Sequence, residues 1–331
     1  MKKYVLVTDT HLGRSNENEL YLNTTLNLFN VIIEYCIDNN IKDIIHCGDF
    51  FDKKIFGSKN ITYKTIEISE QIFQNITNNG LTLYIIVGNH DLILKTQNIP
   101  NSLTFFKNYN INLIDEEPFI LNNITLAPWK YDIAELDDND ILLGHFEING
   151  CYRDNKTTID DVNNYSINDF NHFKQVYSGH IHLTQKNKNI MYIGSPYQMN
   201  YGDPYIDRGF YVLTENNELE MIVYNEAPKF ITINEYDNLK TIDIENNNVR
   251  IKLNDNNDIK NEKFVNEIKK LNPLNVKIEW DLKEKENDIT LDEEIKEKED
   301  ILFDYIDKIE KPEYIKEKML KTILNSLLKE I

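Results

Sequence analysis

The sequence predicts a layered α/β fold in which helices pack on a β-sheet. Over residues 4–87, short apolar segments rich in β-branched residues alternate with longer segments whose apolar residues recur at helical spacing. This β-α-β-α-β order is typical of α/β domains. Several predicted strands also end in a short loop that carries Asp, Asn or His. Because ligands in open α/β sheets bind just outside the carboxyl ends of the strands, these loops are the first place to look for function.

The length and composition allow one large domain and a smaller one. The chain has 331 residues, and its 41% hydrophobic, 27% charged and 11% aromatic residues are ordinary for a soluble globular protein. Met1–Val7 lacks a long apolar core and a cleavage site, so it is expected to form the first strand and not a signal peptide. No apolar run is long enough to cross a bilayer, and the three cysteines have no paired spacing. Together these features favour a cytoplasmic protein with reduced thiols.

The net charge of −19 limits how the chain could bind nucleic acid. Binding to DNA by bulk electrostatics requires many Lys and Arg residues on the contact surface. The sequence therefore argues against a protein that coats nucleic acid. It leaves open an enzyme that holds a phosphodiester through metal cations.

The first part of the chain alternates strands and helices. Glu19–Asn39 carries apolar residues at helical spacing, and Asn78-Asn79-Gly80 is typical of a helix C-terminus. The expected elements are the strand Tyr4–Thr8, the helix Glu19–Asn39, the strand Ile41–Cys47, the helix Tyr63–Thr77 and the strand Leu81–Val87.

From Asn112 onward the pattern changes to short strands separated by turns rich in Asn and Asp. The expected strands are Phe119–Leu121, Ile124–Pro128, Ile141–Leu143 and Val176–Ser178, followed by a closing meander of Asn189–Gly194, Gly209–Thr214 and Glu218–Asn225. Glu215-Asn216-Asn217 is suited to a hairpin turn within this meander. The first domain is therefore expected to span residues 1–230.

The remaining residues predict a small module and a helical end. The expected elements are a linker around Phe230–Asp243, a strand-helix-strand module of Val249–Leu253, Lys263–Leu271 and Val276–Leu282, a charged segment at Lys283–Asp300, and two amphipathic helices at Ile301–Ile309 and Tyr314–Ile331. These elements divide the rest of the chain into a small module, 231–283, and a linker with a helix pair, 284–331.

Five loops that follow predicted strands carry metal-binding types of side chain. They are Asp9-Thr10-His11, Gly48-Asp49, Gly88-Asn89-His90-Asp91, Gly144-His145 and Gly179-His180-Ile181-His182. Imidazole nitrogen suits zinc, iron and manganese, and carboxylate oxygen favours manganese or magnesium. A carboxylate such as that of Asp49 can bridge two cations, and two-metal centres activate water and clamp a phosphoryl group. The sequence therefore predicts that these loops converge on one metal centre.

Each loop taken alone has a simpler explanation. Asp9-Thr10-His11 could be an ordinary strand-end turn, and Gly48-Asp49 could be a helix N-cap. The pair in Gly179-His180-Ile181-His182 is a stronger signal, because alternate residues of an extended chain share a face. The joint occurrence of all five loops favours a functional site. Two histidines outside the loops are interpreted as structural, namely His46 and His172.

The ordered motifs resemble those of the calcineurin-like metallophosphoesterases. The matching blocks are Asp9-x-His11, Gly48-Asp49-x-x-Asp52, Gly88-Asn89-His90-Asp91, Gly144-His145 and Gly179-His180-x-His182. Within that superfamily the chain most resembles the SbcD-type DNA-repair nucleases, and especially the recombination endonuclease subunit of tailed bacteriophages. Further blocks that carry this likeness are Pro128-Trp129, Gly144–Gly150, Tyr192–Pro196 and Arg208-Gly209-Phe210. The resemblance covers residues 1–225 well, and it implies a four-layer α/β/β/α sandwich.

The resemblance also implies a role for each residue of the loops. One metal would be held by Asp9, His11, Asp49 and His182. The other would be held by Asp49, Asn89, His145 and His180, with Asp49 as the bridge. His90 would face the scissile phosphate, either stabilising the transition state or protonating the leaving oxygen, and Asp91 would orient it. Asp52 would support the site from outside the ligand shell. Family members use manganese, so two Mn²⁺ ions are the expected cofactors.

The partners implied by the resemblance are DNA and an SMC-like coiled-coil ATPase of the SbcC type. The helix pair within 284–331 would contact that ATPase, or it could simply pack on its own domain. The nuclease subunits of the family also form homodimers, and the module at 231–283 resembles a reduced capping domain that guides DNA. A phage-encoded protein of this kind would act in the host cytoplasm.

Two other functions are compatible with parts of the sequence. The first is a phosphoesterase that acts on nucleotides or phosphoproteins. A serine/threonine phosphatase is expected to have Asp-Arg-Gly and Asn-His-Glu, whereas Asp52 is followed here by Lys53-Lys54 and the central loop ends in Asp91. The second is a scaffold without catalysis, but such scaffolds lose ligands and this chain retains them all.

Overall fold

The computed structural model describes residues 2–53, 61–94, 97–136, 140–154, 157–161, 164–214, 216–234, 237–253 and 258–280. Residues 1–281 form one compact unit. The predicted charged linker and helix pair of residues 284–331 lie outside the described residues. Among the residues that are described, no helix is long and apolar enough to span a membrane.

The first sheet has six strands in the order β12-β11-β1-β2-β3-β4. Its strands are β1 (Lys3–Val7), β2 (Asp43–His46), β3 (Thr82–Ile86), β4 (Ile111–Ile114), β11 (Gly209–Thr214) and β12 (Leu219–Val223). The strands β1 to β4 run parallel, and β11 joins β1 in the antiparallel direction. The parallel strands therefore end at the same edge of the sheet.

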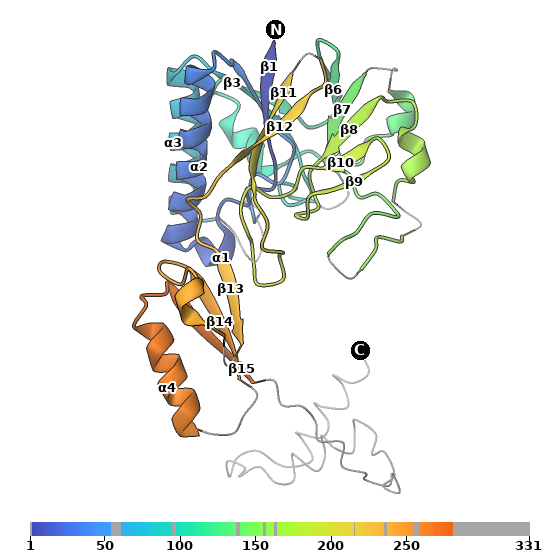
Figure 1. Ribbon diagram of the computed structural model, residues 1–331. Coiled ribbons are helices and arrows are strands. Elements are labelled where there is room, and N and C mark those ends of the chain that lie inside the picture. The colour runs from blue at the N-terminus through green and yellow to red at the C-terminus, as the bar shows by residue number, and fades with distance from the viewer. Residues whose placement is uncertain are drawn as a thin grey trace, which may run out of the picture. The chain divides into compact units, whose positions relative to one another are not determined.

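Two long helices cover one face of this sheet, α2 (Glu19–Asp38) and α3 (Tyr63–Asn78) (Figure 1). The short α1 (Arg14–Glu17) precedes α2. The Asn18 side chain caps α2 by accepting a hydrogen bond from the amide of Leu20. Val5 and Val7 point toward the helices, while Leu6 between them points to the opposite face, as the two-residue period of a strand requires.

The second sheet also has six strands, in the order β5-β6-β7-β8-β10-β9. They are β5 (Phe119–Leu121), β6 (Ile124–Leu126), β7 (Ile141–Gly144), β8 (Gln175–Ser178), β9 (Gln185–Asn187) and β10 (Ile190–Tyr192). The central strands β6, β7, β8 and β10 run parallel. A shared apolar core joins the two sheets face to face, with Leu6 and Ile45 of the first sheet packed with Leu126 and Leu143 of the second.

The outer face of the second sheet is covered by 3₁₀ turns and loops. Among the described residues, η2 (Ile133–Glu135) and η3 (Ile167–Phe170) belong to this layer. The other 3₁₀ turns lie elsewhere: η1 (Ser102–Phe106) packs in the helix-covered core of the first sheet, and η4 (Leu239–Thr241) belongs to the core of a small C-terminal module. Phe146 and Phe170 belong to a third core on this face, together with Val176 of β8. The predicted four-layer α/β sandwich is confirmed, although its fourth layer contains 3₁₀ turns in place of α-helices among the described residues.

A small module follows β12. It consists of β13 (Phe230–Asn234), β14 (Asn248–Leu253), α4 (Asp258–Lys269) and β15 (Asn275–Trp280), and its three strands run parallel. The sequence predicts a linker around Phe230–Asp243, but the first five of these residues form β13. The reason is that Ile231 and Ile233 alternate onto the face that packs against α4.

Candidate metal centre

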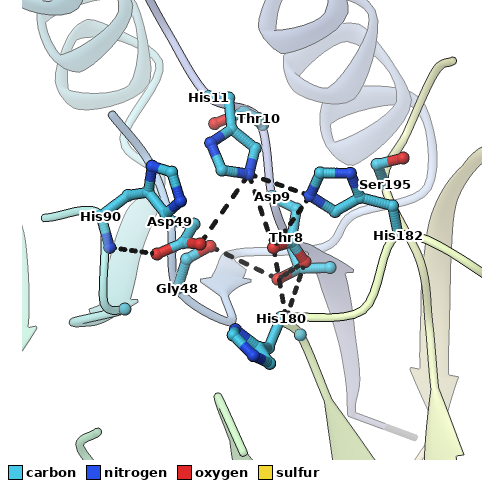
Figure 2. A network of polar contacts seen from close by, with 12 residues as sticks. Thr8, Asp9, Thr10, His11, Gly48, Asp49, His90, His180, His182 and Ser195 are labelled. Carbon is cyan, nitrogen blue, oxygen red and sulfur yellow. Dashed lines mark hydrogen bonds and ion pairs between the residues drawn. The ribbon is translucent and has the colours of Figure 1, made fainter. Parts of the chain in front are cut away.

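Five strand-end loops from both sheets meet at one place in the structure. Figure 2 shows side chains from the loops after β1, β2, β3 and β8. The loops follow β1, β2 and β3 of the first sheet and β7 and β8 of the second. They bring together Asp9, His11, Asp49, Asn89, His90, His145, His180 and His182. The convergence predicted from the sequence is therefore present in the fold.

The first group of donor atoms is formed by Asp9, His11 and His182, which all lie within 4.8 Å of one another. The Nε2 atoms of His11 and His182 are 3.0 Å apart, and each is 3.8 Å from Oδ1 of Asp9. Ligand atoms about 2.1 Å from a cation and roughly at right angles lie about 3 Å from each other. The spacing of the two imidazoles thus fits two ligands of one cation.

The second group contains Asp49, His145 and His180, again within 4.8 Å. Asn89 belongs with it, because its Oδ1 is 2.9 Å from Nδ1 of His180 and 3.3 Å from Nε2 of His145. Oδ2 of Asp49 lies 3.2 Å from Nε2 of His145 and 3.8 Å from Nε2 of His11 in the first group. A single carboxylate oxygen therefore faces both groups.

The electrostatics of the two groups depend on Asp49. Burial would raise the pKa of this carboxyl, but the imidazoles of His145 and His11 hold it well below its ordinary value. Burial would likewise lower the pKa of His145, yet the charge of Asp49 raises it to about 9. A protonated His145 is thus stabilised in the protein alone, and a cation that binds Nε2 would have to replace that proton.

Two of the histidines are oriented by main-chain carbonyls. Nδ1 of His145 lies 2.8 Å from the carbonyl oxygen of Cys47, so Nδ1–H donates there and Nε2 faces Asp49. Nδ1 of His90 lies 2.9 Å from the carbonyl oxygen of Asp52. The hydrogen bond to Asp52 uses Nδ1, so it does not involve Nε2 of His90. The His90 side chain lines the cleft beside the two groups.

The Asp91 carboxylate is bound by main-chain amides of two loops. The resemblance assigns it to orienting His90, but its fully buried carboxylate accepts hydrogen bonds from the amides of Gly88 and Phe51, both at 3.0 Å, and of Phe50 at 3.4 Å. Burial, reinforced by the charge of Asp49, raises the pKa of Asp91 to about 7. Asp91 therefore ties the loop after β3 to the loop after β2, and the His90 ring donates its hydrogen bond to the Asp52 carbonyl oxygen.

Asp52 lies beside His11, and His11, Asp52 and His90 form a third set of candidate donor atoms within 4.8 Å of one another. Its Oδ1 is 3.6 Å from Nδ1 of His11, whose other nitrogen belongs to the first group. Burial raises the pKa of the Asp52 carboxyl. Asp52 thus stands next to a proposed ligand without joining the first group of donors.

Glycine allows these loops to touch. Gly48 has φ +98°, and a Cβ at this position would lie 2.3 Å from Nδ1 of His145. A Cβ on Gly88 would lie 2.2 Å from Oδ1 of Asp49. Each of these glycines precedes a donor residue in sequence, so the Gly-Asp and Gly-Asn pairs reflect close packing between loops.

The donor residues themselves have an unusual backbone. Asp9, His11, Asp49 and His180 have φ values of 50°, 44°, 55° and 84°, in the left-handed region that L-residues seldom adopt. Residues held in such conformations cluster at functional sites, because the surrounding structure has to compensate for the strain. The fold thus maintains an unfavourable backbone at four of the residues that the sequence singles out.

The two groups open into a cleft of about 780 Å³. Two residues that were not predicted as site residues also line this cleft, namely Glu147 and Arg14. Glu147 stands two residues after His145, a spacing that could have identified it. The packing of Arg14 between the rings of Tyr21 and Tyr197, at 4.2 and 4.7 Å, has no comparable sequence signal.

Two further residues support the site from behind. Arg208 donates hydrogen bonds of 2.7 Å to the carbonyl oxygen of His182 and to Oγ of Ser195, and so fixes the loop after β8. The Trp129 ring centroid lies 5.5 and 5.2 Å from those of His145 and His180, which gives the second group an aromatic wall. Both residues fall within blocks that carry the family resemblance, but their contacts come from the tertiary structure.

The two histidines interpreted as structural lie apart from the donor groups. His46 is fully buried, and its Nε2 is 3.0 Å from Oγ1 of Thr10. Burial lowers the pKa of His46 to about 3, so its imidazole is neutral in the folded protein. His172 is exposed and its ring lies against that of Phe173.

Comparison with known proteins identifies the family of this chain. Residues 2–184 match the family described as calcineurin-like phosphoesterase. The chain is 32% identical to exonuclease subunit 1 of Enterobacteria phage T4 over 242 residues, which cover 67% of this chain and 68% of that protein. Among solved structures, a dimetal phosphatase from Danio rerio is 10% identical with a TM-score of 0.34, over 64% of this chain and 91% of its own. The chain belongs to the calcineurin-like phosphoesterases.

Proposed function

We propose that this metallophosphoesterase is the nuclease subunit of a DNA recombination and repair complex and that it hydrolyses phosphodiesters with two divalent cations. The observation that carries the proposal is the position of Asp49, whose Oδ2 faces the first group at 3.8 Å and the second at 3.2 Å. A carboxylate between two sets of nitrogen and oxygen donors is the arrangement that a two-metal phosphoesterase needs.

The donor atoms fit two cations by their chemistry and spacing. The first cation would be held by Asp9, His11, Asp49 and His182. The second would be held by Asp49, Asn89, His145 and His180. Mixed imidazole and carboxylate ligands suit manganese, which is our first choice. When bound, the cations would supply Lewis-acid polarisation of the phosphoryl oxygens and activation of water.

His90 would act on the substrate without binding a metal. Burial alone would lower the pKa of its imidazole, but the charge of Asp49 and the hydrogen bond to the Asp52 carbonyl raise it above its ordinary value. A protonated imidazole at the wall of the cleft is suited to stabilise the transition state or to protonate the leaving oxygen. Asp52 would support His11 from outside the ligand shell, and Asp91 would hold the loop that carries His90.

The similarity to a phage exonuclease subunit supports DNA as the substrate. The net charge of −19 means that the cations and a partner subunit would supply much of the attraction for the phosphate backbone. We propose an SMC-like ATPase of the SbcC type as that partner, a homodimer of the nuclease subunit, and action in the cytoplasm. Residues 231–283 would form a reduced capping module. Deleting residues 300–331 is expected to break binding to the ATPase while Mn²⁺-dependent cleavage persists.

The decisive experiment is digestion of end-labelled duplex and single-stranded DNA by the purified full chain in Mn²⁺. The reaction is run with and without the candidate ATPase and ATP, and Asp49→Ala serves as the inactive control. We expect phosphodiester cleavage that requires Mn²⁺ and Asp49. Hydrolysis of a cyclic nucleotide or a phosphopeptide, with no cleavage of either DNA, would contradict the proposal and support a different phosphoesterase.

A further inference from the structure

The two ring nitrogens of His180 face different surroundings. Nδ1 lies 2.9 Å from Oδ1 of Asn89, inside the second donor group. Nε2 points the other way and lies 3.9 Å from Oε2 of Glu147. For Nδ1 to act as a metal ligand the proton of the neutral ring has to be on Nε2, because only an unprotonated nitrogen binds a cation.

Glu147 is held firmly on that side of the ring. Its Oε1 accepts a hydrogen bond of 2.6 Å from Nη2 of Arg153. The buried hydroxyl of Tyr192 fixes the main chain on either side of Glu147, because it donates to the carbonyl oxygen of Phe146 at 3.0 Å and accepts from the amide of Ile148 at 3.1 Å. One oxygen of the Glu147 carboxylate is therefore held by the Arg153 guanidinium, and the other oxygen faces His180.

Other imidazoles of the site follow the same pattern. His145 presents Nε2 to Asp49 and donates from Nδ1 to the Cys47 carbonyl. His11 presents Nε2 to the first group, while its Nδ1 faces the Asp52 carboxylate at 3.6 Å. In each case one nitrogen faces the donor group and the other faces an oxygen acceptor. Metal-binding histidines are commonly oriented in this way, and the acceptor also makes the ligand nitrogen more basic.

We propose that Glu147 is a positioning residue for His180. It fixes the Nε2–H tautomer, so that Nδ1 faces Asn89 and the second cation, and Arg153 holds the carboxylate in place. Glu147 would thus have the same role for His180 in the second group as Asp52 has for His11 in the first group. The inference rests on the two-cation part of the proposed function and is independent of which phosphodiester is cleaved.

The test measures the binding of Mn²⁺ alone to the metal-free full chain. Isothermal titration calorimetry gives the affinities, and electron paramagnetic resonance gives the amount of unbound ion. The variants are Glu147→Ala, Glu147→Gln and Arg153→Ala. Asp154→Asn is the matched control, because it removes one negative charge from the same cleft and keeps an oxygen that can accept the hydrogen bond from the Thr157 amide. Glu147 is partly exposed at the surface, and thermal unfolding of each metal-free variant checks that it is folded.

In Glu147→Ala we expect one Mn²⁺ to bind as in the wild type and the other to bind about 10- to 100-fold more weakly. Glu147→Gln keeps an acceptor for Nε2–H without the charge, so its loss is expected to be smaller. Arg153→Ala is expected to fall between the wild type and Glu147→Ala. Asp154→Asn is expected to keep both affinities.

Three results would overturn this role. The first is a Glu147→Ala variant that binds both ions with wild-type affinity. The second is an Asp154→Asn variant that weakens binding as much as Glu147→Ala, because the effect would then be one of general charge. The third is a wild-type chain that binds a single Mn²⁺. A chain that binds two Mn²⁺ ions but leaves DNA intact would refute the nuclease proposal alone.

Discussion

The Nε2 atoms of His11 and His182 lie 3.0 Å apart although 171 positions separate the two residues in sequence. Two imidazole nitrogens at this distance, with Asp9 beside them, repel each other when both are protonated and attract a cation when both are neutral. The contact also joins the two sheets, since His11 follows β1 of the first and His182 follows β8 of the second. A cation at this position would stabilise the sandwich as well as take part in catalysis.

Replacing His182 by Ala is expected to remove one of the two cation sites. The first group would keep Asp9 and His11 but lose a nitrogen donor, so Mn²⁺ content is expected to fall from two ions per chain to about one, and cleavage is expected to be lost. Metal content after gel filtration, measured by mass spectrometry, checks this. His172→Ala is the control, because it removes an exposed histidine from outside the donor groups. Two bound ions in His182→Ala would rule out its place as a ligand.

Replacing His90 by Ala is expected to separate chemistry from metal binding. The imidazole lines the cleft and packs edge-on against the His11 ring, with the centroids 4.7 Å apart, but its ring hydrogen bond is to the Asp52 carbonyl. Loss of a general acid typically lowers a rate by about 10²- to 10⁴-fold. We expect a loss of this size in cleavage under single-turnover conditions, with two Mn²⁺ ions retained. A drop in metal content would show instead that His90 is a ligand.

Replacing Asp91 by Ala is expected to destabilise the protein. Three main-chain amides would lose their acceptor in a buried place, and each unsatisfied group costs about 1–3 kcal/mol. We expect the free energy of unfolding in urea to fall by at least about 3 kcal/mol. Asp91→Asn retains an acceptor oxygen, so its loss is expected to be smaller. Unchanged stability in Asp91→Ala, with lower activity, would favour the role of orienting His90.

The buried His46 gives the folded protein a dependence on acid. Its pKa is about 3 in the folded state and about 6.5 when unfolded, so the unfolded chain takes up a proton first. The stability that His46 contributes is complete above pH 6.5 and declines as the pH falls toward 3. Between pH 7 and pH 5 the wild type is expected to lose about 2 kcal/mol from this residue.

The comparison variant for His46 is His46→Phe, which removes the titrating group. The His46 ring lies against the rings of Phe29 and Phe50, so a Phe side chain would have aromatic neighbours there. Thr10 would lose His46 as a partner but keep its hydrogen bond to the Phe50 carbonyl. Urea unfolding at both pH values gives the difference between the two proteins. Equal losses in the wild type and in His46→Phe would show that His46 does not titrate on unfolding.

The strands and loops that build the site could be predicted from sequence. The apolar runs before Asp9, Asp49 and Asn89 have the length and composition of buried strands, and parallel strands place their ends at one edge. One strand that was not predicted lacks this signal. Gln185–Asn187, which forms β9, is polar and lies at the edge of its sheet, where pairing to β10 supplies the order.

The supporting contacts could not be predicted, because they join loops that are distant in sequence. The Asp52 carbonyl that orients His90 and the Tyr192 hydroxyl that fixes the chain around Glu147 act through main-chain atoms and burial. No pattern of residue types encodes such a contact. The left-handed conformation of Asp49 is a further example, since Asp is usual in many backbone regions and only the packed loops enforce this one.

The left-handed backbone at Asp9, His11, Asp49 and His180 implies that this site is kept at the expense of conformational stability. A lineage released from selection for catalysis could exchange these residues for glycine, relax the four turns and become harder to unfold. A natural relative that lacks these metal-binding residues would thus be expected to be more thermally stable and to have no catalytic activity.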